Sequence, residues 1–421
     1  MTAAVGSKTI QPVNAEMSVR INAARLVCVM LMMYVHVPTG EGSASVMDIS
    51  GDIRIDHWLE TIVIEGPGRA SAALLSVVSG YLAALTLLRR QTGAIGLYQR
   101  RFRSIVLPMI CWAVLTCAIY LLLGQRDALV LAADSNWLDK LNMVLFLTEA
   151  PNGPTLHLGF LRDLFVCVLL SPLLLIAVRR LPFVTIFLLL MVYLFEHSGQ
   201  LVIILRPLVI FGFSLGMLLA MRRLPLDYLD AYFGWFLSLA GVFAVLIAWT
   251  DAGMFVHAKA YLATYGVSLK ETILYPLCRL FGSLAIWTLL SVASVKTMQR
   301  YTARFSNYLF AAFCSHFLVL TVLFNGFWLP IFGDRDAYGY LLWFVAAPAV
   351  SMLMAIGMVN LAAVVYSPLA VLMTGGRVPN EGAMFPGKIW LAGVWQRLHI
   401  KKTGSKSLPG ASSQAVEAPR S

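Results

Sequence analysis

Long apolar runs alternate with short polar loops along most of the chain. A helix of about 20 apolar residues is long enough to cross the ~30 Å hydrocarbon core of a membrane. Together the runs predict an all-α polytopic membrane protein with about ten transmembrane helices, which places both termini on one side. The runs are 20–38, 67–88, 104–124, 157–178, 182–196, 199–221, 229–250, 268–295, 308–332 and 338–373.

The charged residues between the runs separate by sign. The loop that begins with Arg89 and every second loop from it are rich in arginine and lysine, whereas the alternate loops carry mainly aspartate and glutamate. Cytoplasmic loops carry the basic excess in membrane proteins. We therefore predict that both termini are cytoplasmic. The predicted division is a cytoplasmic segment at 1–19, an integral-membrane domain at 20–373, and a tail at 374–421 that is first amphipathic and then disordered.

The composition supports a membrane protein and excludes other classes. Hydrophobic residues make up 59% of the chain and charged residues 13%, with a mean hydropathy of +0.78, so polar groups could not cover a water-exposed surface. The net charge of +11 follows from topology and from attraction to anionic lipid, so we expect a lipid bilayer and no nucleic acid as partner. The six cysteines lie in apolar runs without metal-ligand spacing, which predicts buried thiols and no metal site.

The first apolar run carries two ionisable residues on one helical face. Arg25 and His36 are eleven residues apart, close to three turns, so their side chains share a face and lie ~16 Å apart along the axis. One interpretation is an arginine that snorkels and a histidine at the interface. The other is a functional interior, since a charge at bilayer depth costs at least ~2.5–3.5 kcal/mol and normally marks a site. Because the two side chains share one helical face, the functional interpretation is favoured.

Four further arginines lie inside or at the rim of apolar runs, on the same predicted side as His36. They either pair with acidic neighbours inside the bundle or form a site for an anion, because guanidinium matches carboxylate and phosphate geometry. The anion would be the distal carboxylate of a succinyl group, an acidic sugar, or the pyrophosphate of a lipid-linked glycan. The arginines are Arg69, Arg162, Arg206 and Arg279, and the acidic neighbours are Glu65, Asp163 and Glu271.

Among the other histidines, His157 is the second candidate for the site because it lies beside Arg162 and Asp163 at the start of a run. His316 lies in the middle of a run and is equally consistent with a packed structural histidine. No role is assigned to the remaining four, which are His57, His197, His257 and His399.

Two motifs follow the first run. The second run contains Ser79-Gly80-Tyr81, which is typical of close helix packing through small residues and also suits the passage of a ligand chain along the backbone. Arg100, Arg101 and Arg103 precede the third run. They are either topogenic charges, which is the more common case, or a cradle for a phosphate.

These residues resemble the membrane-bound acyltransferase 3 family, which O-acylates glycans and lipids. The most specific match is the spacing of Arg25 and His36, and within the family the first helix is most similar to the exopolysaccharide, succinoglycan-type O-succinyltransferases. Two departures are Leu74-Leu75-Ser76-Val77-Val78, where the family has a phenylalanine pair, and Gly159 in place of a tryptophan. The other matches are Ser79-Gly80-Tyr81, Tyr98 with Arg100, Arg101, Arg103 and Pro108, His157-Leu158-Gly159-Phe160-Leu161, and Ser306 with Tyr308 and His316.

The resemblance implies that 20–373 is a membrane O-acyltransferase domain of the bacterial inner membrane. It would move an acyl group from cytosolic acyl-CoA to a sugar hydroxyl of an exopolysaccharide or of its lipid-linked precursor. Acyl-CoA is the expected donor substrate, no cofactor is expected to stay bound, and polysaccharide assembly machinery is a further candidate partner. Succinyl is favoured over acetyl, because an acetyl group would need no cation near the chemistry.

The candidate residues divide into three groups by expected role. His36 and Arg25 are catalytic, with His36 as base or as transient acyl carrier and Arg25 on the phosphates of the donor. Donor binding is assigned to Ser79, Gly80, Tyr81, Arg100, Arg101 and Arg103. Anion or acceptor binding is assigned to Arg69, His157, Arg162, Asp163, Arg206 and Arg279.

The main alternative is a transporter or flippase of a lipid-linked glycan or organic anion. Buried arginines and a titrating His36 also suit translocation, but the chain lacks paired halves with matching broken helices. A non-catalytic scaffold is a third interpretation, which the pair of Arg25 and His36 disfavours.

Overall fold

The computed structural model describes twelve stretches of the chain, and in them it contains helices and turns but no strand, as the sequence predicts. All of them belong to one unit, which ends at Val378. The predictions for 1–14 and for the tail beyond Arg377 lie outside the described residues. The described stretches are 15–38, 55–88, 94–124, 137–146, 153–195, 206–222, 226–251, 256–265, 267–292, 302, 304–332 and 337–377.

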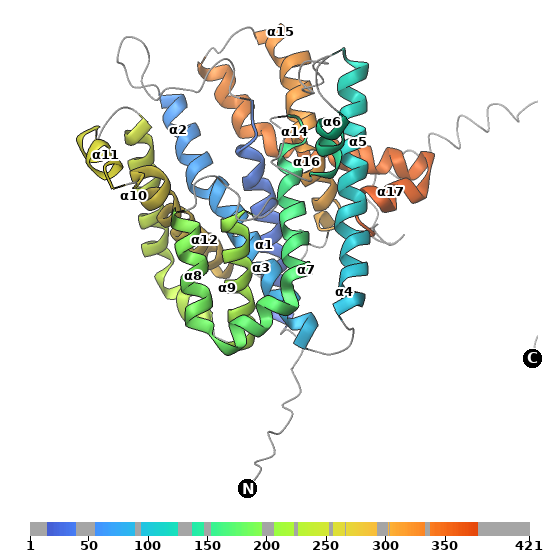
Figure 1. The fold of residues 1–421 in the computed structure, drawn as a ribbon. Helices are drawn as coiled ribbons and strands as arrows, with labels where there is room; N and C mark the ends of the chain where they lie inside the picture. The colour runs from blue at the N-terminus through green and yellow to red at the C-terminus, as the bar shows by residue number, and fades with distance from the viewer. Residues whose placement is uncertain are drawn as a thin grey trace, which may run out of the picture. The chain divides into compact units, whose positions relative to one another are not determined.

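The helices follow one another with short π-helical and 3₁₀ turns (η) between them (Figure 1). The first half contains α1 Ala15–Tyr34, α2 Ile55–Val63, η1 Ile64–Gly68, α3 Arg69–Leu88, α4 Ala94–Arg101, η2 Phe102–Val106, α5 Leu107–Leu122, α6 Trp137–Leu145, η4 Leu156–Leu158, α7 Gly159–Arg180 and α8 Pro182–Phe195. The second half contains α9 Pro207–Arg222, η5 Asp227–Tyr232, α10 Phe233–Asp251, α11 Val256–Ala263, η6 Leu269–Leu274, α12 Tyr275–Val292, α14 Leu309–Leu323, η7 Phe324–Trp328, α15 Leu329–Phe332, α16 Ala337–Val365 and α17 Ser367–Met373.

Eight helical segments of the described chain are long and apolar enough to cross a membrane, and α8 and α9 are shorter apolar helices. The fold class of an all-α polytopic membrane protein is therefore confirmed, while the number of ten crossings and the side of the termini stay predictions. The eight segments are Ala15–Tyr34, Trp58–Leu88, Ala94–Leu122, Leu156–Arg180, Asp227–Asp251, Leu269–Ser291, Leu309–Phe332 and Gly339–Val365.

Several boundaries differ from those predicted, including the start of the third crossing at Ala94 instead of residue 104, and three of the others have a local physical reason. The first helix begins at Ala15, so it takes in the last residues of the expected segment 1–19, and Glu16 in its first turn suits a helix N-terminus. The second crossing begins at Trp58 because the π-helical η1 accommodates Pro67 without ending the helix. The last predicted run is interrupted at Tyr366, whose backbone is extended, since Pro368 opens a new helix and cannot continue the old one.

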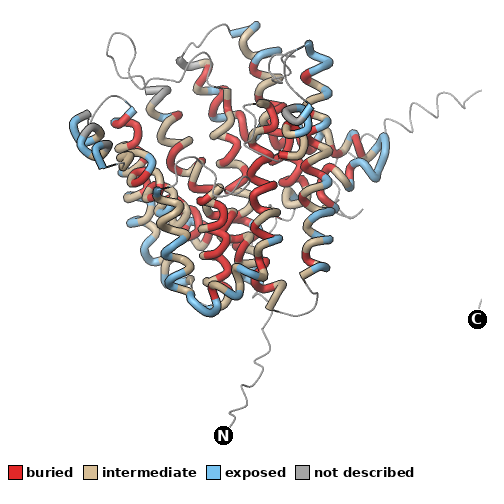
Figure 2. The backbone as a smooth tube through the Cα atoms, in the orientation of Figure 1, coloured by how far each residue is buried: buried red, intermediate tan, exposed pale blue. Residues whose placement is uncertain are grey.

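Helix α1 lies in the interior of the bundle. It contacts α3, α12, α14 and α16, and eight of its twenty residues are buried, within the bundle whose buried positions the tube view marks (Figure 2). Beside it, α3 and α9 pack backbone against backbone. A Cβ on Gly80 would lie 1.9 Å from the carbonyl oxygen of Phe213, and a Cβ on Gly216 would lie 1.9 Å from that of Val77. The packing interpretation of Gly80 is therefore confirmed.

An ion pair that the sequence does not single out fixes the start of α1. The Arg20 guanidinium donates to the two carboxylate oxygens of Asp230, at 2.5 and 3.1 Å, and to the carbonyl oxygen of Trp287. It also lies 4.3 Å from the Trp287 ring. These contacts tie α1 to η5 and α12 and so hold the axis on which Arg25 and His36 are placed.

Candidate functional site

Three histidines from distant segments meet just beyond the C-terminal end of α1. The ring centroid of His36 lies 5.2 Å from that of His316 and 6.0 Å from that of His157, and the last two are 4.7 Å apart. Phe317 stacks on His157 at 5.7 Å, and Phe313 packs against both His157 and His316. The sequence predicted two of these histidines for the site, and the structure adds His316, which α14 supplies.

Backbone contacts set the orientation of the two buried rings. His157 Nε2 lies 2.9 Å from the carbonyl oxygen of Cys314, and His316 Nδ1 lies 2.6 Å from that of Phe313. Both nitrogens must donate, because a carbonyl oxygen only accepts. In the neutral rings His157 Nδ1 and His316 Nε2 are therefore acceptors, and both are buried without a hydrogen-bond partner among the described residues. A hydroxyl group that entered the cluster would satisfy such an acceptor.

His36 lies in the turn that follows the membrane-spanning helix. Its backbone N–H donates to the carbonyl oxygen of Met33 at 3.1 Å, and its side chain is half-buried. Burial is the largest cause that lowers the pKa of His36 below its ordinary value of 6.5, and His157 adds to it. The charges of Arg69 and Arg206 act in the same direction. The imidazole is therefore neutral near pH 7 and can accept a proton.

Asp163 joins two of the predicted arginines beside the histidines. Its fully buried carboxylate lies 2.6 Å from Nη2 of Arg162 and 3.3 Å from Nε of Arg206. Arg162 also donates to the carbonyl oxygen of Phe146 at 3.1 Å. The predicted pairing of Arg162 with Asp163 is confirmed. Two guanidiniums share one carboxylate, so the group keeps a net positive charge.

Arg69 and Arg279 flank the ring of Tyr275, at 5.8 and 5.1 Å. Arg69 pairs with Glu65 as predicted, with Nε 2.8 Å from Oε2. Among the described residues no ion pair joins Arg279 to Glu271, since eight helical residues place the two about 12 Å apart along the axis. Glu271 is exposed, and Arg279 instead donates to the Tyr193 hydroxyl at 3.4 Å.

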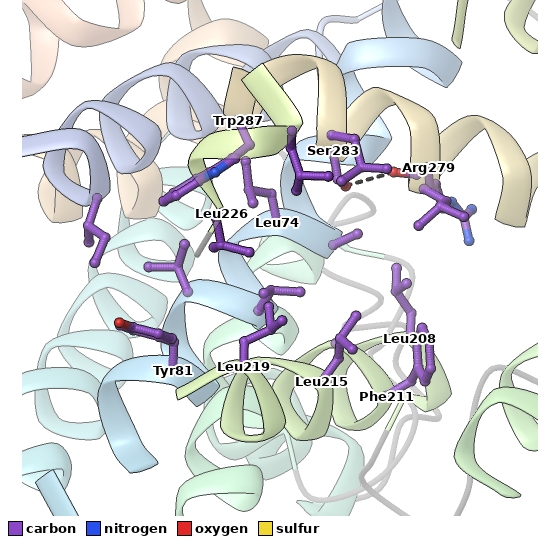
Figure 3. Close-up of a pocket in the computed structure, with 18 of the residues that line it drawn as sticks. Leu74, Tyr81, Leu208, Phe211, Leu215, Leu219, Leu226, Arg279, Ser283 and Trp287 are labelled. Carbon is purple, nitrogen blue, oxygen red and sulfur yellow. Dashed lines mark hydrogen bonds between the residues drawn. The ribbon is translucent and has the colours of Figure 1, made fainter. Parts of the chain in front are cut away.

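An apolar cavity of about 260 Å³ lies between α1, α3, α9 and α12. Arg279 is at one end of it, and Tyr81 and Trp287 are at the opposite end (Figure 3). The wall between these ends is mainly aliphatic, with Leu215 and Leu219 from α9. A cavity with this lining suits an apolar chain whose charged end group stays beside the arginine.

The Arg25 side chain is half-buried, and it lies within electrostatic range of Arg101 and Arg377. Arg101 is also half-buried, whereas Arg100 and Arg103 are exposed. The three arginines predicted for donor binding therefore do not form one group. Arg101 belongs with Arg25, and Arg100 donates back to the carbonyl oxygen of Gly96 in its own helix.

The Ser79-Gly80-Tyr81 motif does not act as one unit. Gly80 is in the contact with α9, Tyr81 lines the apolar cavity, and Ser79 is half-buried. The assignment of the three to the donor stays a prediction. Among the described residues, no group of three histidine, cysteine, aspartate or glutamate side chains has the geometry to hold a metal ion.

Comparison with known proteins identifies the family of the chain. The chain matches the family model described as an acyltransferase domain over residues 18–360. Over 379 residues it is 28% identical to the succinoglycan biosynthesis protein ExoH of Rhizobium meliloti. The aligned residues cover 86% of this chain and 94% of that protein. No solved structure matches the chain. The family match confirms the enzyme interpretation over that of a transporter or flippase.

Proposed function

The chain belongs to the acyltransferase 3 family, and on this premise we propose that it transfers a succinyl group from acyl-CoA to a sugar hydroxyl of the lipid-linked precursor of an exopolysaccharide. The observation that carries the proposal is the histidine cluster at one end of α1, with Arg25 in a separate group of arginines three helical turns away. The relative ExoH is named for succinoglycan biosynthesis, which supports a polysaccharide acceptor.

In the proposed reaction His36 removes the proton of the sugar hydroxyl as the oxygen attacks the thioester carbonyl. The C–O ester bond forms, the C–S bond breaks, and the leaving thiolate takes up the proton from the imidazole. A base at hydrogen-bond reach contributes to the rate if its pKa leaves it unprotonated, which is the state that burial favours for His36. His157 and His316 each present an acceptor nitrogen that has no partner in the described part of the chain and can orient the hydroxyl.

The arginines near His36 favour succinyl over acetyl. Arg69 and Arg206 both act electrostatically on His36, and their side chains stay 40% and 39% exposed although each is paired. A guanidinium binds a carboxylate with charge-assisted hydrogen bonds, so either can receive the distal carboxylate of a succinyl group. An acetyl group offers no such contact.

The apolar cavity favours an acceptor that is still linked to a lipid. Its aliphatic wall suits the hydrocarbon chain, and Arg279 at one end suits the phosphate that joins chain to sugar. Tyr275 lies between Arg279 and Arg69, and Arg69 is in electrostatic range of His36. The sugar would therefore extend from Arg279 towards the histidines.

The purified full-length protein tests these proposals directly. Succinyl-CoA and acetyl-CoA are each supplied with either the lipid-linked oligosaccharide or the finished polymer, and the product mass identifies the transferred group. We expect succinyl ester on the lipid-linked acceptor. Acetyl ester would overturn the choice of donor, product on the polymer alone would overturn the choice of acceptor, and no thioester consumption with any pair would overturn the proposed reaction.

Replacing Arg206 by leucine tests the choice of acyl group. We expect succinyl transfer to fall about tenfold and acetyl transfer to change less than about twofold, because one charge-assisted hydrogen bond to the succinyl carboxylate is lost. The ratio of kcat/KM for the two donors measures this. A matched control is Arg222→Leu, which removes an exposed arginine at the far end of α9. An equal fall with both donors would contradict a carboxylate contact.

A further inference from the structure

The chain that follows α17 is fixed against the start of α5. Trp112 Nε1 donates to the carbonyl oxygen of Met373 at 3.0 Å. The next residues form a tight turn in which Gly375 and Gly376 have φ of +63° and +80°, a region that side chains with a Cβ rarely adopt. The two glycines therefore direct Arg377 back towards the helices.

Gly375 is required by space as well as by backbone conformation. A Cβ at this position would lie 2.5 Å from the carbonyl oxygen of Ser104 in η2 and 3.5 Å from Nη1 of Arg377. The turn thus approaches the backbone three residues after Arg101. This contact brings a residue from the end of the described chain beside the arginine run at the start of the third crossing.

Arg377 is held in this position and has no counter-ion among the described residues. Its guanidinium lies 5.2 Å from the Phe310 ring. Burial and the charge of Arg101 both lower the pKa of Arg377, and Arg377 and Arg101 in turn act on Arg25. None of the three pairs with a carboxylate in the part of the chain that the structure describes.

Three half-buried guanidiniums repel one another, and an anion that binds between them lowers the electrostatic free energy of the group. The structure assigns Arg25, Arg101 and Arg377 to one binding site for a phosphate or pyrophosphate group, with Arg377 as the member that the C-terminal turn supplies. The identity of the ligand rests on the proposed function, in which the phosphate belongs to the acyl-CoA donor. An anionic lipid headgroup offers the same chemistry and is the other source to be tested.

This assignment does not follow from the family comparison. Arg377 lies beyond residues 18–360, which the family model matches, and the sequence places it in the tail rather than in the site. The turn also gives the site a physical link to Phe310, which is in the same helix as His316. The anion site and the histidine cluster are thereby attached to a common element, α14.

The test uses the full-length protein in phosphatidylcholine nanodiscs with CoA as the probe. We expect Arg377→Ala to weaken CoA binding and to raise the KM for the acyl-CoA donor about tenfold, because a charge-assisted contact to phosphate is lost. The acceptor KM and kcat should change less than about twofold, since the histidines are untouched. Arg377→Lys should recover part of the affinity. Gly375→Val keeps all three arginines but displaces the turn, and should weaken CoA binding in the same way.

Arg180→Ala is the matched control, because it removes an exposed arginine from the end of α7. If Arg377→Ala binds CoA as tightly as Arg180→Ala does, the assignment of Arg377 is wrong. Phosphatidylglycerol is added to the nanodiscs in a second series. If this lipid competes with CoA in the wild type and not in Arg377→Ala, the result supports the site. A different result is that the wild type binds this lipid while Arg377→Ala does not, with no thioester consumed by either. That result would overturn the proposed function and retain the three-arginine site.

Discussion

Replacing His36 by alanine is expected to lower acyl transfer by about a hundred- to ten-thousandfold, which is the contribution of a positioned general base. The expected loss is in kcat, since neither the arginine group around Arg25 nor the apolar cavity includes His36. Thioester consumption by the purified protein, with donor and acceptor varied separately, measures the two effects. His257→Ala is the control, because His257 is exposed on α11 and has no expected role.

The pH dependence of the same reaction distinguishes a base from a structural histidine. The pKa of His36 is lowered in the folded protein, so the neutral and active form is populated at pH 7. It is lost only as the pH falls below the ordinary value of 6.5 towards the lowered pKa. The acid limb of kcat/KM should therefore lie below pH 6.5 in the wild type and be absent in His36→Ala. A wild-type limb that persists unchanged in the variant would assign it to another group.

The elements that depend on local pattern could be predicted from the sequence. Arg25 and His36 share a face because helical geometry alone determines their phase over three turns, and the apolar runs determine most of the membrane-spanning segments. Pairing between residues one or four positions apart was equally accessible. Arg162 with Asp163 and Glu65 with Arg69 are both formed.

What depends on tertiary packing could not be predicted. His316 is one hundred and fifty-nine residues from His157, and nothing along the chain shows that α14 places it 4.7 Å from that ring. Arg377 is similar, because its place depends on the fit of Gly375 against Ser104. The pair of glycines before an arginine was the only local sign of that turn. The boundary errors at Pro67 and Tyr366 have a different origin, since proline either widens or ends a helix according to its neighbours.

Replacing Asp163 by alanine is expected to cost about 3–5 kcal/mol of folding free energy, because it leaves buried guanidinium charge without a carboxylate. Asp163 is fully buried and Arg162 is 7% exposed, so water cannot replace the lost partner, whereas Arg206 is 39% exposed and can turn outward. If Arg206 does so, its charge leaves the surroundings of His36, and transfer falls beyond what lost stability explains. Thermal and denaturant unfolding in detergent, with transfer measured well below the unfolding transition, separate the two effects.

Asp251→Ala provides the contrast for this prediction. Asp251 pairs with Lys270, but the two side chains are 32% and 27% exposed, and a pair in such a position is worth about 0–1 kcal/mol because water screens it. The two variants remove the same group from two ion pairs that differ in burial. Equal losses of stability would show that Asp163 does not compensate buried charge. The double variant Asp163→Ala, Arg162→Met removes both members of the buried pair. If its stability recovers and its succinyl transfer does not, Asp163 both neutralises Arg162 and holds Arg206 in place.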